Sequence, residues 1–201
     1  VWQMELEARK ITEKEFHDKL RTVNDDVHVT DTRWSPEMEH TIQHNPMWVN
    51  MKYYSIERQS RNFILNWFKE KCQDKKVLDY CCGNGDDSIQ IARAKAREVI
   101  GIDTSDISIK NCERLAKQEG VDHICSFQVA DAENLPFPDN TFDVVNEYGC
   151  LHHLELDRAF SELARVVQPA GKVICNEALA HNIIIHTYRK LTPKLRTPWE
   201  V

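Results

Sequence analysis

The feature with the clearest chemical meaning is a short loop that contains two glycines. It covers residues 79–85 (DYCCGNG) and directly follows the apolar pair Val77-Leu78. Glycine adopts positive φ angles without steric cost, so Gly83 and Gly85 let the backbone approach a ligand closely. The N–H groups at the start of the following helix also lack intrahelical partners. The loop therefore predicts a binding site, although an ordinary tight turn between a strand and a helix shows the same pattern.

Two carboxylates follow the next two apolar runs of the chain. Asp103 comes after residues 99–102, and Asp131 comes after residues 124–129. A carboxylate at the end of a second strand can accept hydrogen bonds from both ribose hydroxyls of a nucleoside. A carboxylate at the end of a third strand can accept a hydrogen bond from an adenine amino group. Each residue alone is also a common cap, but together with the glycine loop they predict a nucleoside-binding crevice.

The pattern from residue 76 onward explains how these groups come together. Short apolar runs predict strands at 77–80, 99–102, 124–129, 142–145 and 171–175. Helical patterns between them predict helices over 88–96, around 109–116 and over 159–167, the last closed by Pro169. This alternation predicts an α/β fold with a doubly wound, Rossmann-like parallel sheet. Ligands of such a sheet bind at the carboxyl ends of its strands.

Helical patterns also flank this alternation. Helices are predicted over Met4–Arg21, with Ile11 and Phe16 loosely on one face, and from about Ser55 to Cys72. A further helix is predicted over 183–191. The expected organisation is an N-terminal helical cap (1–75), a cofactor-binding core (76–179) and a C-terminal helix (180–201).

Composition excludes several classes of protein. The chain has 201 residues, 41% of them hydrophobic, with 26 basic and 32 acidic side chains. Residues 77–179 hold 9 basic and 18 acidic side chains, which would repel a phosphate backbone, so we expect no nucleic-acid partner. No apolar run approaches the roughly 18–20 residues that span a bilayer, so we expect no stable membrane insertion.

The cysteines indicate a reducing compartment. Seven cysteines, an odd number, lie scattered and mostly within apolar runs, which is typical of free buried thiols. The adjacent pair Cys81-Cys82 lacks the spacing of a zinc motif, so we expect no metal there. The first residues also lack the pattern of a signal peptide. We therefore predict a cytoplasmic protein.

Several sequence blocks resemble the class I S-adenosylmethionine-dependent methyltransferases. The blocks are VLDYCCGNGDDSIQIA, VIGIDTSDISI, FQVADAENLPFPDNTFDVV, LHHL and RVVQPAGKVI. They are most similar to the small-molecule branch that includes quinone and sterol methyltransferases. The resemblance implies an enzyme that moves a methyl group from S-adenosylmethionine to a small-molecule acceptor.

The resemblance also assigns roles to residues. Its cofactor-binding set in this chain comprises Asp79, Cys81, Gly83, Gly85, Asp103, Thr104, Asp131, Ala132 and Asn146. Asp79 and the loop would hold the methionine part, Asp103 the ribose, and Asp131 with Ala132 the adenine. Cys81 replaces the first loop glycine of the family, and we expect this position to need less torsional freedom.

Two other functions fit the same residues. Gly83-x-Gly85-x-x-Ser88 nearly matches the dinucleotide motif GxGxxG, and Asp103 would serve NAD(P) equally, which would make the protein an oxidoreductase. A catalytically inactive, methyltransferase-like partner protein is the second alternative. The block around Asp131 favours the methyl donor over the nicotinamide.

Methyl transfer from a sulfonium is an in-line displacement, so the protein mainly supplies proximity and orientation. A general base is required only if the acceptor must lose a proton. The candidates follow the fourth strand: Glu147, Tyr148, His152 and His153. The resemblance further implies that the N-terminal helices and the segment after residue 180 roof the acceptor pocket. His17 and Tyr53-Tyr54 would close over the cofactor, or serve as ordinary packing residues.

The end of the chain leaves no residues for the last two of the family's seven strands. We therefore expect a five-stranded sheet in the order 3-2-1-4-5, with the fifth strand as an exposed edge. On this interpretation the chain is a fragment that aggregates or needs a partner.

Overall fold

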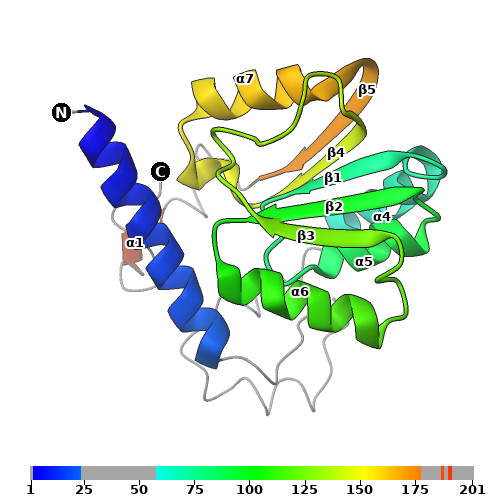
Figure 1. The fold of residues 1–201 in the computed structure, drawn as a ribbon, viewed down its shortest axis with the longest axis horizontal. Helices are drawn as coiled ribbons and strands as arrows, with labels where there is room; N and C mark the ends of the chain where they lie inside the picture. The colour runs from blue at the N-terminus through cyan, green and yellow to red at the C-terminus, as the bar shows by residue number, and fades with distance from the viewer. Residues whose placement is uncertain (1, 24–57, 178–186, 188–189, 192–201) are drawn as a thin grey trace.

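A computed structural model describes residues 2–23, 58–177, 187 and 190–191 (Figure 1). Its centre is a five-stranded parallel sheet in the order β3-β2-β1-β4-β5. The strands are β1 (Lys76–Tyr80), β2 (Glu98–Asp103), β3 (Cys125–Val129), β4 (Phe142–Tyr148) and β5 (Val167–Asn176). The predicted fold class and strand order are confirmed.

Helices cover both faces of the sheet. They are α1 (Trp2–Val23), α4 (Arg58–Lys71), α5 (Asp86–Arg93), α6 (Asp106–Gln118), the 3₁₀ turn η1 (Leu151–His153) and α7 (Leu156–Val166). Helices α4, α5 and α6 lie on one face and α7 lies on the other (Figure 1). Helix α1 stands apart and lies beside the carboxyl ends of the strands.

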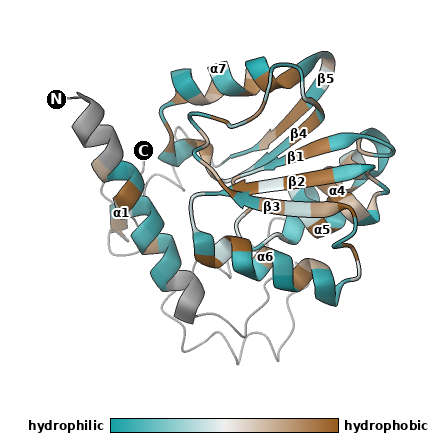
Figure 2. Cartoon of the chain, in the orientation of Figure 1, coloured by the Kyte–Doolittle hydropathy of each residue, from teal (hydrophilic) through white to brown (hydrophobic). Residues whose placement is uncertain are grey.

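The core forms because neighbouring strand residues point to opposite faces of the sheet. Val77 packs in the cluster with Ile89 and Leu115, whereas Leu78 packs in the cluster with Leu163. Both strand residues are fully buried. Two covered faces therefore explain why the strands are continuous apolar runs rather than alternating ones (Figure 2).

The register of the strands aligns the functional motifs. Asp79 of β1 lies opposite Gly101 of β2 and Asn146 of β4. Asp103 pairs with Val129, immediately before the loop that contains Asp131. The glycine loop and both carboxylates thus leave the sheet at the same edge, as the parallel arrangement predicted.

Two predicted boundaries were wrong. Strand β4 continues to Tyr148, so Asn146 and Glu147 lie within it rather than after it. Pro169 does not close α7, because the helix ends at Val166 and Pro169 lies inside β5. The pairing shifts from Phe142↔Val167 to Val144↔Lys172, which leaves a bulge. A bulge tolerates proline, which has no N–H to donate.

Other predictions fall mainly on residues outside the described part of the chain. These are the pair Tyr53-Tyr54, most of the helix predicted over 183–191, and any strands after β5. Among the described residues, β5 has no strand on its outer edge, where Val173 is 42% exposed. No helix in the described residues is long and apolar enough to cross a membrane.

Candidate functional site

The loop after β1 is built from left-handed backbone conformations. Cys81, Gly83 and Gly85 have φ angles of 57°, 54° and 88°. The expectation that Cys81 needs less torsional freedom is therefore wrong, because it adopts the same conformation as the two glycines. Left-handed backbone is sterically unfavourable for a residue with a Cβ. The surrounding contacts, including a 2.7 Å hydrogen bond from the N–H of Cys82 to the carbonyl of Ile102, hold the loop in place.

Gly85 is required for packing as well as for its torsion angle. A Cβ atom at this position would lie 3.0 Å from the Sγ of Cys112 on α6. Cys112 also donates to the carbonyl of Gly83 at 3.2 Å, and its Sγ lies 3.8 Å from that of Cys82. The contact with Cys112 and burial raise the pKa of the Cys82 thiol, so this cysteine is protonated and acts as a packing residue.

Asp103 ties the end of β2 to the glycine loop. Its carboxylate accepts from the N–H of Gly83 at 3.0 Å and from the N–H of Ser105 at 2.9 Å. The side chain is buried, and Thr104 beside it is half-buried. Two backbone donors therefore fix the orientation of the carboxylate at the end of β2.

Asp79 and Asn146 form an internal network instead of facing the crevice. Asp79 is 2% exposed and accepts from Ser88 at 2.5 Å and from the amide of Asn146 at 2.9 Å. Asn146 also donates to Asp87 at 3.2 Å, and Asp87 forms an ion pair with Arg61 of α4. Burial and the charge of Asp87 raise the pKa of Asp79 to about 7. This network joins β1, β4 and α5 underneath the loop.

The loop after β3 is joined to helix α1. Asp131 accepts from the N–H of Glu133 at 2.9 Å and from the ammonium of Lys10 at 2.6 Å. The carbonyl of Ala132, which is buried, accepts from the hydroxyl of Tyr80 at 2.8 Å. The sequence analysis missed Lys10, because no local pattern relates it to a loop far along the chain.

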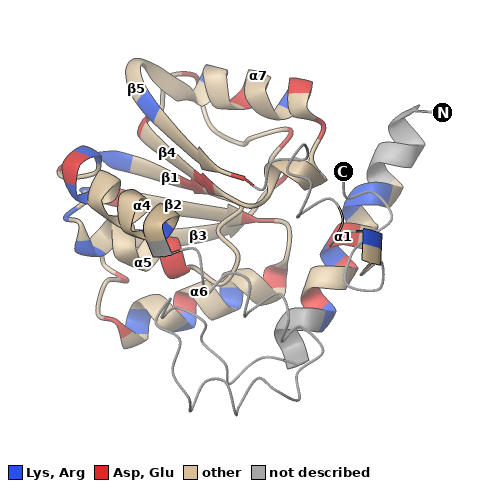
Figure 3. Cartoon of the chain, turned by 180° about the vertical axis from the view of Figure 1, so that it is seen from behind, with Lys and Arg blue, Asp and Glu red and all other residues tan. Residues whose placement is uncertain are grey.

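Charged contacts hold the rest of α1 against the same edge of the sheet. Arg9 contacts the carboxylate of buried Glu133, and Lys14 lies 2.8 Å from Asp106. Figure 3 shows that basic and acidic residues both occur along α1. Burial opposes ionisation of Glu133, but its hydrogen bonds from the N–H of Glu155 and from Arg9 and Lys10 lower its pKa overall. Helix α1 therefore lies across the loops that carry the predicted cofactor residues.

Three of the four candidate bases, Glu147, His152 and His153, face different partners. Glu147 is fully buried and accepts from the N–H of Cys150 at 2.8 Å, and burial together with nearby Glu177 raises its pKa to about 8. His152 lies 2.8 Å from Glu177, which the sequence analysis missed. Burial opposes ionisation of Glu177, but the contact with His152 helps to lower its pKa. His153 instead faces Glu13 of α1.

Comparisons with known proteins fit this arrangement. Residues 77–171 match the family described as a methyltransferase domain. A demethylmenaquinone methyltransferase of Anoxybacillus flavithermus is 38% identical over 112 residues, 54% of this chain and 47% of the relative. A tocopherol O-methyltransferase of Arabidopsis thaliana is 35% identical over 135 residues, 66% of this chain and 36% of the relative. The chain thus spans less than half the length of these relatives.

A solved structure shows the same fold. The PH0226 protein from Pyrococcus horikoshii OT3 superimposes with a TM-score of 0.60 and 28% identity, over 75% of this chain and 71% of that protein. Residues 77–171 thus match a methyltransferase domain in sequence, and the sheet they form is shared with this solved structure. More particularly, the relatives named here are methyltransferases of small molecules.

Proposed function

We propose that the protein transfers a methyl group from S-adenosylmethionine to a small-molecule acceptor at the carboxyl edge of the sheet. The observation that carries this proposal is the convergence of the glycine loop, Asp103 and Asp131 at one edge of a methyltransferase domain. S-adenosylmethionine would supply a methyl group already activated by its sulfonium. The residues of the chain then orient the two reactants and exclude water.

The residues present fit this cofactor. Asp103 is a buried carboxylate whose orientation is fixed by two backbone N–H donors, which suits an acceptor for two hydroxyls. Asp131 is 36% exposed at its side chain and would accept from the adenine amino group while sharing its charge with Lys10. Thr104 and Ala132 lie beside these two acids. Gly83 and Gly85 shape the loop for the methionine part.

Asp79, Cys81 and Asn146 have a supporting role in this proposal. Asp79 and Asn146 hydrogen-bond to each other and to groups of α5 below the loop. Cys81 supplies the first left-handed residue of the loop. They would therefore set the shape of the methionine subsite without donating to the cofactor directly.

Affinity for the cofactor tests the site. In the Asp103→Ala variant the ribose hydroxyls lose a charged acceptor, which costs about 1.5–3 kcal/mol, or roughly a ten- to hundredfold weaker Kd for S-adenosylmethionine. Asp131→Asn should lose less affinity than Asp131→Ala, because an amide still accepts. The exposed residue Asp122 provides the control Asp122→Ala. An unchanged Kd in Asp103→Ala, or preferential binding of NADH by calorimetry, would overturn the assignment.

Among the candidate bases we assign proton removal to His152. Glu147 holds its proton at neutral pH because its pKa is raised to about 8, so it is a poor base there. His152 has Nδ1 2.8 Å from the Glu177 carboxylate, which orients the ring, so that Nε2 is the nitrogen assigned to the substrate proton. His153 is turned toward Glu13. Glu177 is therefore a positioning residue for His152.

Methyl transfer is tested by the mass increase of one methyl group on candidate acceptors, incubated with the protein and S-adenosylmethionine. For an acceptor that must lose a proton, His152→Ala should lower kcat by about 10²–10⁴-fold, with an unchanged Kd for the cofactor. Glu177→Gln should lower kcat by less than His152→Ala does, because the imidazole remains but loses part of the contact that orients it. Exposed His123 gives the control His123→Ala. Binding of S-adenosylmethionine without transfer to any acceptor would favour the inactive alternative.

A further inference from the structure

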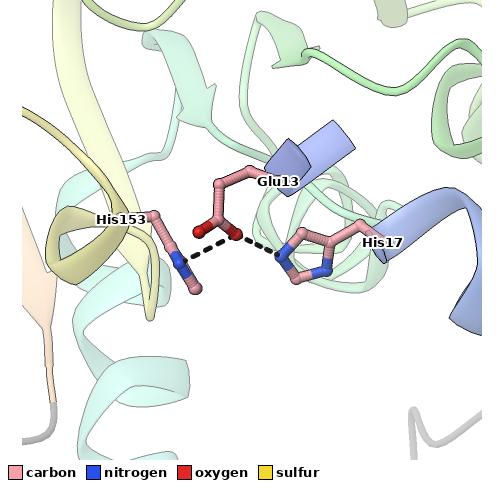
Figure 4. A group of neighbouring side chains, drawn as sticks. All are labelled: Glu13, His17 and His153. Carbon is pink, nitrogen blue, oxygen red and sulfur yellow. Dashed lines mark ion pairs between the residues drawn. The ribbon is translucent and has the colours of Figure 1, made fainter. Parts of the chain in front are cut away.

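Helix α1 and the turn after β4 bring together two imidazoles and a carboxylate. Glu13 and His17 lie one helical turn apart on α1, and His153 ends η1 (Figure 4). The Oε2 atom of Glu13 lies 3.1 Å from Nδ1 of His153 and 3.8 Å from Nε2 of His17. In Figure 4 the carboxylate lies between the two rings, and all three potential ligand atoms lie within 4.8 Å of one another.

These spacings match the ligand shell of a transition metal. An ion about 2.1 Å from each nitrogen or oxygen ligand places neighbouring ligand atoms about 3.0–3.4 Å apart, in octahedral or tetrahedral geometry. The two separations from Glu13, 3.1 and 3.8 Å, lie within a few tenths of an ångström of these values. The two ring nitrogens lie within 4.8 Å of each other, and small rotations of the side chains would bring them closer around an ion. Two imidazoles with one carboxylate suit Zn²⁺ and its first-row neighbours, whereas Mg²⁺ and Ca²⁺ prefer oxygen ligands.

The side chains of the cluster are partly enclosed, and neighbouring residues hold the backbone of His153 in place. The side chains of Glu13, His153 and His17 are 10%, 16% and 33% exposed. The backbone of His153 is held at both ends, because its N–H donates to the carbonyl of Cys150 at 2.9 Å and its carbonyl accepts from the guanidinium of Arg9. Among the described residues, its buried Nδ1 forms no hydrogen bond despite facing the carboxylate.

The three side chains also have the ligand chemistry that such an ion prefers. A carboxylate offsets part of the charge of a divalent cation, and an imidazole nitrogen binds it through a lone pair. The guanidinium of Arg9, one turn away, is directed to Glu133 and leaves this position open to a cation.

We propose that Glu13, His17 and His153 form a binding site for a first-row divalent cation, with Zn²⁺ as the preferred ion. The three ligands leave one coordination position for water, as in zinc sites with three protein ligands. The ion would fasten α1 to the turn after β4. It would therefore hold α1 across the carboxyl edge of the sheet and add to the charged contacts of Arg9 and Lys10.

The experiment uses the whole chain, freed of metal with a chelator and titrated with Zn²⁺ by calorimetry. The bound metal is counted by elemental analysis. We expect about one ion per chain, and an affinity at least about tenfold lower in each of Glu13→Gln, His17→Ala and His153→Ala. His123→Ala is the matched control, because His123 is exposed and remote in sequence from the cluster. His17 is the most exposed of the three ligands, so His17→Ala is the variant least prone to misfold.

Two further measurements separate this site from the cysteines and from a simple ion pair. Co²⁺ in place of Zn²⁺ should give an absorption spectrum of nitrogen and oxygen ligation without thiolate bands. Zn²⁺ should also slow proteolysis within α1 in the wild type and in His123→Ala, but not in the three ligand variants. Absence of metal binding, retention of affinity in the ligand variants, or a thiolate spectrum would each overturn the proposal. In the first case the cluster is an ion pair between Glu13 and a protonated histidine.

Discussion

The sheet and helix α1 are held by opposite kinds of contact. Val77, Leu78 and Val145 in the sheet are fully buried, in apolar clusters on both faces. Helix α1 buries charged residues, with Arg9 and Glu13 each 7% exposed, while its Ile11 is 55% exposed. The difference is visible in Figure 2, where the strands are mainly hydrophobic and α1 is mainly hydrophilic.

The two kinds of contact predict that the sheet and α1 respond differently to salt and to the loss of a charge. Apolar packing does not depend on partner charge, so the sheet keeps its register under varied conditions. Ion pairs at a partly exposed surface weaken with salt and with the loss of either charge. The sheet therefore positions Asp103 and Asp131, and charged contacts hold α1 across them. Four changes test this division.

The largest effect is expected in the core. Phe68 of α4 is 1% exposed, so Phe68→Ala should lower the free energy of unfolding by about 3–5 kcal/mol through lost burial and a cavity. Phe63, on the same helix, is 66% exposed, and Phe63→Ala should change the free energy of unfolding by no more than about 0.5 kcal/mol. Denaturant unfolding measures both. Equal losses in the two variants would mean that the apolar core does not dominate stability.

The next largest effect is expected at the charged contacts between α1 and the loop after β3. Glu133→Gln removes the charge shared by Arg9 and Lys10, and a hydrogen bond to a charged group is worth about 1.5–3 kcal/mol. Protection of α1 from proteolysis should fall roughly ten- to hundredfold, with a much smaller change in the unfolding of the sheet. Glu113→Gln, at an exposed position of α6, is the control. If α1 and the sheet unfold in a single transition, the expectation that α1 is held independently of the sheet is wrong.

A smaller effect concerns pH. The pKa of Glu147 is raised to about 8 in the folded protein, so the folded state keeps a proton that the unfolded chain releases above its usual pKa of about 4.3. Stability should therefore fall as pH rises from about 4.3 to about 8. Glu147→Gln cannot release this proton, so its stability should not fall over this pH range, in contrast to the wild type. Parallel stability–pH curves for the two proteins would refute the raised pKa.

The smallest effect is expected at the more exposed ion pairs of α1. Lys14 pairs with Asp18 and Asp106 where its side chain is 35% exposed. Lys14→Ala should speed proteolysis of α1 by only a few-fold, and the difference should disappear in 1 M salt, where screening acts over about 3 Å. Lys110→Ala, whose lysine is 74% exposed at its side chain, serves as the comparison. An effect as large as that of Glu133→Gln would show that α1 depends on surface charge rather than on its buried pair.

Much of the sheet was predictable because its information is local. Each strand is an apolar run, and each helix carries a 3.6-residue pattern. The connections of a parallel sheet then bring Asp103 and Asp131 to one edge. The boundaries at Tyr148 and Pro169 were missed, because pairing with β1 lengthens β4 and a bulge accommodates the proline.

Helix α1 shows where local information fails. Its apolar residues predicted a helix, and α1 extends over Trp2–Val23. Its buried face is polar, however, and Arg9, Lys10 and Glu13 find their partners in loops after β3 and β4. No pattern within the helix specifies those partners.

By itself, the sequence determined the α/β class, the strand order and the acids at the strand ends, because hydrophobic periodicity and chain connectivity leave few alternatives. Only the tertiary structure decided how neighbouring site residues divide their roles. Asn146 joins the network of Asp79, while Glu147 points to the opposite face and keeps a proton. His152 faces Glu177, whereas His153 faces Glu13. Adjacent residues diverge because direction depends on backbone geometry, and the pKa depends on burial and on charges brought from distant segments.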